Sequence, residues 1–133
     1  MAEGDIKVSR EDSSGNYEEV NANDYYNDGK TVIGINAQTG TTYTLALSDA
    51  GKLVRCSNSG AITVTIPKNS VTAFPTNTVI TIQQVAAGVV TVAPVDEDVT
   101  LTGFGGLKTA GQYAAVQLIK IDTNTWTMIG GVE

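Results

Sequence analysis

The stretch "SDAGKLVRCSNSGAITVTIP", residues 48–67, decides the fold because it holds two short β-strands and the turns that precede them. In its second half Ile62, Val64 and Ile66 alternate with threonines, which is the period of two expected of a half-buried strand. Pro67 ends this strand, since proline has no N–H to donate to a strand ladder. The polar "SNSG" ahead of the strand predicts a turn. The stretch therefore predicts a compact β unit.

The preceding residues extend this pattern toward the N-terminus. "TTYTLALSDAGKLVRC", residues 41–56, predicts a strand, a turn and a second strand. Leu45 and Leu47 belong to the incoming strand, and "DAGK" at 49–52 reverses the chain. Gly51 suits that reversal because glycine adopts a positive φ at no steric cost.

The rest of the chain from residue 31 repeats the same alternation. It recurs in "TVITIQQ", "GVVTVAP", "DVTLTG", "YAAVQLIKI" and "NTWTMIGG", each flanked by Gly, Pro, Asn or Asp. Eight or nine short strands are expected, and no longer window has a helical period. The sequence predicts an all-β fold, a small antiparallel β-sandwich or barrel of jelly-roll-like form over residues 31–133, with an extended N-terminal arm.

Residues 1–30 form that arm, and their charge sets them apart. They contain eight acidic and three basic residues, whereas the remaining 103 residues contain six acidic and five basic ones. Few aliphatic residues are present, so the arm could not fold alone. "DIKVSR" and "YEEV" nevertheless alternate around the turn signal "EDSSGN", which predicts a marginal hairpin or an extended segment. A disordered tail is the alternative.

Apolar side chains in the arm are candidates for contact with a partner. Tyrosine is favoured where one end of a side chain is packed and the other is hydrated. The candidate anchors are Ile6, Val8, Tyr17, Tyr25 and Tyr26.

The composition argues against several classes of function. The chain has no histidine and one cysteine, Cys56, so the common general base, the common metal ligand and an internal disulfide are all missing. We predict no catalytic residue, no metal and no cofactor, and we expect Cys56 and Trp126 to lie in the core or an interface. Lysine and arginine are not clustered, which argues against nucleic acid. No apolar run approaches the roughly 20 residues of a membrane span.

Two local motifs favour structural interpretations. "LTGFGGLKTAG", residues 101–111, is rich in glycine, but a phosphate cradle needs a following helix and a strand pattern follows instead. "PVDEDVT" clusters Asp96, Glu97 and Asp98 without the ligand spacing of a calcium loop. We expect a loop or bulge in the first and a solvated turn in the second.

Residues 41–133 contain a set of landmarks: the turn in Leu45–Val54, "VTIP" at Val64–Pro67, "AFP" followed by a strand that ends in Gln83 and Gln84, and the closing "QLIKIDTNTWTMIGG". With these landmarks the region resembles a small β module that recurs in structural proteins of tailed bacteriophages, in head decoration proteins, head fibres and pieces of tail fibre. The acidic "GDIKV" start is similar to the capsid-anchoring starts of some decoration proteins.

The resemblance implies a virion structural protein that is not an enzyme. The leading expectation is a capsid decoration or cement protein on the capsid exterior, made in the cytoplasm of the host bacterium. Its arm would bind the major capsid protein and its body would form a homotrimer, with no nucleic acid or membrane as partner. One alternative is a tail-fibre or head-fibre module that attaches to host-surface glycans. Another is an enzyme that uses carboxylates alone, with candidates Asp96, Glu97, Asp98 and Asp122.

Overall fold

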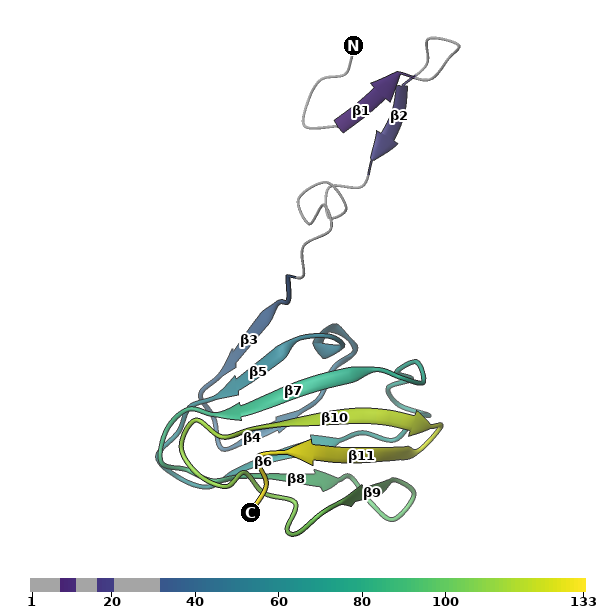
Figure 1. Ribbon diagram of the computed structural model, residues 1–133. Helices are drawn as coiled ribbons and strands as arrows, with labels where there is room; N and C mark the ends of the chain where they lie inside the picture. The colour runs from purple at the N-terminus through teal and green to yellow at the C-terminus, as the bar shows by residue number, and fades with distance from the viewer. Residues whose placement is uncertain (1–7, 12–16, 21–31) are drawn as a thin grey trace. The chain divides into compact units, whose positions relative to one another are not determined.

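In the computed structural model, regular structure is almost entirely β-strand, which confirms the all-β class (Figure 1). The structure describes residues 8–11, 17–20 and 32–133. The chain divides into two compact units, Met1–Val32 and Ile33–Glu133. We call the second unit, Ile33–Glu133, the body.

Two short strands are described in the first unit. β1 (Val8–Glu11) and β2 (Tyr17–Val20) pair antiparallel. Val8 lies opposite Val20 at one end of the ladder, and Glu11 lies opposite Tyr17 at the other. The hairpin that the alternation in "YEEV" predicts is therefore present.

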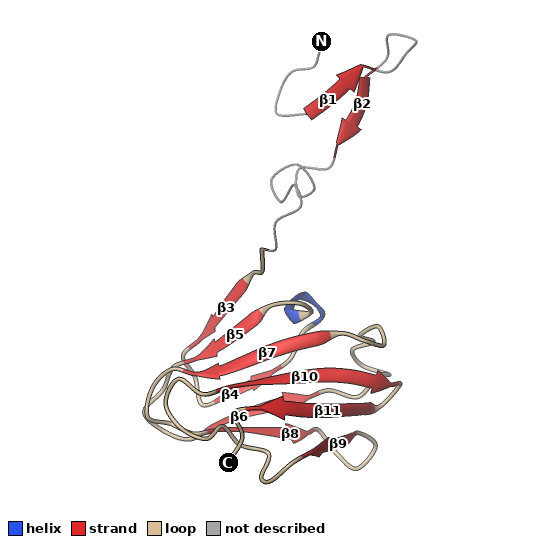
Figure 2. Cartoon of the chain, viewed as in Figure 1, coloured by secondary structure: helices blue, strands red, loops and turns tan. Residues whose placement is uncertain are grey.

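Within residues 32–133 the body has nine strands in two sheets, in line with the eight or nine expected (Figure 2). The larger sheet has the spatial order β3 (Ile35–Gln38), β5 (Leu53–Cys56), β7 (Val79–Gln84), β10 (Ala115–Asp122), β11 (Thr125–Gly130) and β9 (Thr100–Gly103). The smaller sheet has the order β4 (Thr42–Thr44), β6 (Ile62–Ile66) and β8 (Val90–Pro94). A short 3₁₀ turn, η1 (Leu47–Asp49), follows β4.

Consecutive strands from β3 to β8 alternate between the two sheets, so the chain winds through three coils, β3–β4, β5–β6 and β7–β8. Successive coils run parallel within each sheet. In the larger sheet Ile35 lies opposite Leu53, and Leu53 lies opposite Thr81. The arrangement is that of a short β-solenoid, in which each coil packs on the next.

The antiparallel, jelly-roll-like order expected from the sequence is wrong for these coils. Residues 45–52 carry the chain from β4 in the smaller sheet to β5 in the larger one, and they do not close a hairpin. Leu47, expected in a strand, is exposed in η1. Alternation did not reveal the direction of pairing because side chains have a period of two in parallel and antiparallel strands alike.

Antiparallel pairing occurs at the end of the chain. β10 and β11 form a hairpin with a register shift between Lys120 and Asp122, and β10 also pairs antiparallel with β7. β9 then joins β11 in parallel, with Leu101 opposite Trp126. The C-terminal hairpin therefore completes the larger sheet beside the stacked coils.

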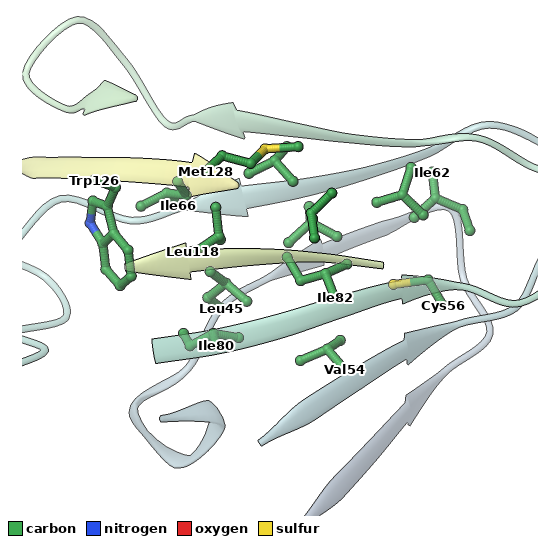
Figure 3. Packing of buried hydrophobic residues seen from close by; sticks show 14 of the residues in the cluster. Leu45, Val54, Cys56, Ile62, Ile66, Ile80, Ile82, Leu118, Trp126 and Met128 are labelled. Atoms are coloured by element: carbon green, nitrogen blue, oxygen red, sulfur yellow. The ribbon is translucent and has the colours of Figure 1, made fainter. Parts of the chain in front are cut away.

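The hydrophobic core lies between the two sheets and is built from the inward positions of both (Figure 3). Ile62, Val64 and Ile66 are almost fully buried, as their alternation predicts. Trp126 is also buried, and its ring meets that of Phe74 edge-on, with the centroids 5.4 Å apart. Edge-to-face contact is a favourable geometry for aromatic rings.

Two glycines are required by the backbone. Gly51 has a φ of 76°, which confirms the positive φ expected in this turn. Gly88 donates a backbone hydrogen bond of 2.9 Å to the carbonyl of Asn58, and a Cβ at Gly88 would overlap the carbonyl oxygen of Gly60. The loops of neighbouring coils therefore stack at a distance that only glycine allows.

Candidate functional site

The candidate anchors of the N-terminal segment are only partly described. Val8 lies in β1 and Tyr17 lies in β2, at opposite ends of the β1–β2 ladder. Ile6, Tyr25 and Tyr26 lie outside the described residues. The structure thus brings two of the five residues into one hairpin.

The outward positions of the smaller sheet are dominated by threonine. Thr63 lies between Thr42 and Thr91 in the ladder, and Thr65 lies between Thr44 and Ala93. We call this surface the threonine face; its members are Thr42, Thr44, Thr63, Thr65, Thr91 and Ala93. Each has a small side chain, and none is charged.

The outward positions of the larger sheet carry both aliphatic and polar side chains, the polar ones including Thr81, Gln83, Gln117 and Thr127. Ile35, Leu53, Thr81, Gln117 and Ile129 form one continuous row across five strands. Val79 and Ile119 lie opposite each other in the next row. We call this surface the aliphatic face; its apolar members are Ile35, Leu53, Val79, Ile119 and Ile129.

A buried polar network closes the core at the first coil. The Asp49 carboxylate is fully buried and accepts hydrogen bonds from the Tyr43 hydroxyl at 2.6 Å, from Asn36 Nδ2 at 2.8 Å and from the Ala46 N–H at 2.9 Å. Gln38 Nε2 donates to Asn36 Oδ1 at 2.9 Å. The network satisfies a charge that would otherwise be costly to bury.

The network residues that lie on β3 pair with apolar residues of the neighbouring strand β5. Asn36 and Gln38 of β3 lie opposite Val54 and Cys56 of β5. β3 thus has a polar inward face at the end of the stack. Sequence reasoning treated Asp49 as a turn residue and missed the network. A usable signal was the pair of polar residues two positions apart in "INAQ", because residues two apart in a strand share a face.

The network stabilises the fold through its hydrogen bonds. The pKa of Tyr43 is raised from 10.0 to about 12. Burial of the hydroxyl is the largest cause, and its hydrogen bond to Asp49 is the second. The phenol is therefore neutral at physiological pH and serves as a hydrogen-bond donor. It holds the buried carboxylate and the β4 strand together.

The acidic turn after β8 is an ion-pair cluster. Lys68 Nζ lies 2.8 Å from Asp96 Oδ2 and 3.1 Å from Asp98 Oδ2. The hydrogen bond from Lys68 lowers the pKa of Asp96. Asp122 is not part of this cluster. It is the last residue of β10 and accepts a hydrogen bond of 2.8 Å from the N–H of Thr123. Among the described residues, no group of three or more His, Cys, Asp or Glu side chains could hold a metal ion.

The glycine-rich segment, residues 101–111, begins in β9 and continues as a loop from residue 104, as expected, and β10 follows it. Thr109 within this loop is fully buried; its hydroxyl donates to Gln84 Oε1 at 2.6 Å and accepts from the Val90 N–H at 3.0 Å. Isolated bridges also join Lys108 to Thr91 and Thr109 to Val132. The loop therefore covers the free edge of β8 and ties it to the C-terminus.

Lys120 is a buried lysine whose role is also structural. Its side chain is 2% exposed, and Nζ donates to Asn69 Oδ1 at 2.5 Å and to the carbonyl of Phe74 at 2.6 Å. Burial lowers the pKa of this ammonium. Lys120 fixes the loop that places Phe74 against Trp126.

Cys56 is a free thiol in the core, in agreement with the expected buried position. Burial raises its pKa from 9.0 to about 11. The neighbouring Arg55 points to the opposite face of β5, where its Nε donates to Gln83 Oε1 at 3.3 Å. The arginine is therefore not placed to stabilise a thiolate.

Comparisons with known proteins add no identification, because no protein-family model, curated protein or solved structure matches the chain. In the part of the chain that the structure describes, no helix has the length and hydropathy needed to cross a membrane.

Proposed function

We propose that this chain is a structural protein of a tailed-bacteriophage virion that decorates and stabilises the head. Its N-terminal segment would bind the major capsid protein, and its body would form a homotrimer on the capsid exterior. The two sheets would act together as a rigid, sandwich-like body. In this proposal the chain performs no catalysis.

The observation that carries the proposal is the division of the chain into two units of different character. Residues 1–30 hold eight of the 14 acidic residues, whereas residues 33–133 form a unit with its own hydrophobic core. Such a division suits an attachment segment joined to a rigid body. The sequence landmarks of the phage β module lie in the body, in the η1 turn, in β6 and in the β10–β11 hairpin.

A cement protein can bind the shell tightly through many copies of the same weak contact. Each contact with the shell can be weak, because linked contacts within one oligomer gain from a high effective concentration. An extended segment that becomes ordered on binding can cover a large area of the lattice. Its acidic residues would meet lysine or arginine on the capsid protein, so binding should weaken as salt is raised.

The test is a binding experiment with undecorated heads of the phage that encodes the chain. Full-length protein should sediment with the heads, and a variant lacking residues 1–30 should remain in the supernatant. The variant should keep its β-type circular dichroism and nearly the same melting temperature, because the body has its own core. Failure of the full-length protein to bind heads would overturn the proposed function. Equal binding by the shortened protein would place the attachment surface on the body.

A second candidate is a head-fibre or tail-fibre module that binds host-surface glycans. The observation that favours it is the open first coil, since in the part of the chain that the structure describes β3 and β4 each pair with another strand on one side only. A solenoid can be extended by stacking another coil on such an end. A glycan array separates the two candidates: specific binding supports the fibre module, and binding to heads without glycan binding supports decoration.

A further inference from the structure

We infer that the aliphatic face of the larger sheet is the surface through which copies of this chain bind one another. The inference deepens the proposed function and rests on it for the number of copies, three. The occupant of the face is thus the same face of the two neighbouring copies, and the three faces meet around the axis of a closed oligomer.

The first reason is the contrast between the two outward faces of the body. Threonine and the aliphatic β-branched residues both suit exposed strand positions, so strand propensity does not choose between them. The threonine face uses threonine at five of its six positions. The aliphatic face instead exposes Ile35 by 63% and Ile129 by 47%, and adds Leu53, Val79 and Ile119 between them. Thr81 and Gln117 separate Leu53 from Ile129 within the row, and the apolar residues connect diagonally through Val79 and Ile119. An exposed apolar patch of this kind is typical of an interaction site.

The second reason is that polar groups on the aliphatic face bond to one another. Gln117 Nε2 donates to Thr81 Oγ1 at 3.4 Å, and Thr102 Oγ1 donates to Thr127 Oγ1 at 3.3 Å. Burying a polar group is costly when its hydrogen bond is lost. These groups already have partners within the sheet, so the face can be dehydrated at a reduced cost.

The third reason is that the face itself carries no net charge, which permits a second copy as the occupant. The chain has a formal net charge of −6, so two copies repel each other at long range. The charged residues at outward positions of the larger sheet are Arg55 and Asp122, one of each sign, near opposite ends of the strands. A contact between two such faces adds no net charge repulsion. The clustered acids Asp96 and Asp98 lie in the turn between β8 and β9, outside the face.

The area of the aliphatic face can be compared with the surface that one partner contributes to a protein–protein interface. Six strands spaced by about 4.8 Å, with about five residues each, cover roughly 500 Å². One partner in a standard interface contributes about 800 Å² of accessible surface. The face supplies more than half of that area before its projecting side chains and rims are counted.

The test measures the mass of the full-length protein in solution by light scattering coupled to size exclusion. The wild type should be an oligomer, and Ile129→Lys and Ile35→Lys should each shift it toward the 13.9 kDa of one chain. Both residues are exposed on the aliphatic face, so each lysine can be hydrated in the monomer. Thr63→Lys places the same charge on an exposed strand position of the threonine face and should leave the oligomer intact.

A second, milder variant tests whether the oligomer is lost without loss of the fold. Ile129→Thr gives the aliphatic face the residue that the threonine face uses, and threonine suits a strand equally well. It should raise the concentration for half-dissociation by about tenfold, because apolar burial is lost at each contact. Circular dichroism establishes that each variant is folded.

The outcomes separate this inference from the proposed function. A wild type that is monomeric at micromolar concentration overturns the inference, and so does an oligomer that survives all of the Ile129 and Ile35 substitutions. If the full-length protein binds heads in either case, the proposed function stands. If dissociation follows the expected pattern while heads stay bare, the self-association surface stands and the proposed function fails.

Discussion

Tyr43 donates a hydrogen bond of 2.6 Å to Asp49, and this contact ties the first strand of the smaller sheet to the turn that leads back into the larger one. Asn36 on β3 adds a bond to each of them, at 2.9 Å and 2.8 Å. The two edge strands of the first coil are thus held by side chains at the end where, within residues 32–133, no further strand pairs with them. The open end of the body is consequently a fixed structure.

Removing the Tyr43 hydroxyl should destabilise the body. Tyr43→Phe takes one hydrogen bond from a buried carboxylate, and such charge-assisted bonds contribute about 1.5–3 kcal/mol. Urea unfolding should show a lower midpoint at an unchanged slope. Tyr113→Phe is the matched control, because Tyr113 is 61% exposed and should unfold like the wild type. Equal stability of the two variants would mean that the network contributes nothing.

Stability should fall in alkaline solution. Tyr43 has its pKa raised from 10.0 to about 12, and Cys56 has its pKa raised from 9.0 to about 11. A raised pKa means that the folded state keeps a proton the unfolded state has lost. The contribution is complete below the unfolded pKa and disappears as the pH rises through the folded one. We expect the free energy of unfolding to decline between about pH 9 and pH 12.

Urea unfolding at a series of pH values measures this decline. Tyr43→Phe should flatten its upper part, above about pH 10, because phenylalanine does not titrate. Cys56→Ala should flatten the lower part. A free energy that is constant from pH 9 to pH 12 in the wild type would contradict the linkage.

Gly88→Ala should destabilise the body through overpacking. The added methyl group would overlap the carbonyl oxygens of Gly60 and Asn58, and the stacked loops would have to separate. The cost should be roughly 1–3 kcal/mol or more. Gly111→Ala is the matched control, since a Cβ at Gly111 meets no atom within 4 Å. The idea fails if thermal melting is equally affected by both substitutions.

Lys120→Met should loosen the loop that carries Phe74. Methionine keeps most of the side-chain volume but donates to neither Asn69 nor the carbonyl of Phe74. An unpaired buried acceptor costs about 1–3 kcal/mol. Limited proteolysis should cut residues 68–77 faster than in the wild type. Lys108→Met, at an exposed position of the C-terminal loop, should leave the cleavage rate of this loop unchanged.

Much of the local structure was predictable because it depends on neighbouring residues. The alternation around Val64 placed a strand that the structure has at Ile62–Ile66, and Pro67 ends it. The burial of Trp126 and Cys56 followed from their residue types and strand positions. The glycine-rich segment was assigned to a loop because a strand pattern follows it.

The candidate site was less predictable. Three of the five proposed anchors, Ile6, Tyr25 and Tyr26, lie outside the described residues, and the anchoring role of all five stays a prediction. The aliphatic face could not be read from the sequence, because Ile35 and Ile129 are 94 positions apart and join one row only through the intervening strands.

The sequence by itself determined most strand positions and most inward side chains, since both depend on local alternation and on breakers such as Pro67; Leu47 and the polar inward face of β3 are the exceptions. Only the tertiary structure decided which strands pair and in what direction. Leu53 could have paired back on the strand before its turn, but it lies between Ile35 and Thr81 in parallel strands. The physical reason is that ladder hydrogen bonds join backbone groups common to all residues, so the choice of partner depends on how the two sheets together enclose the core.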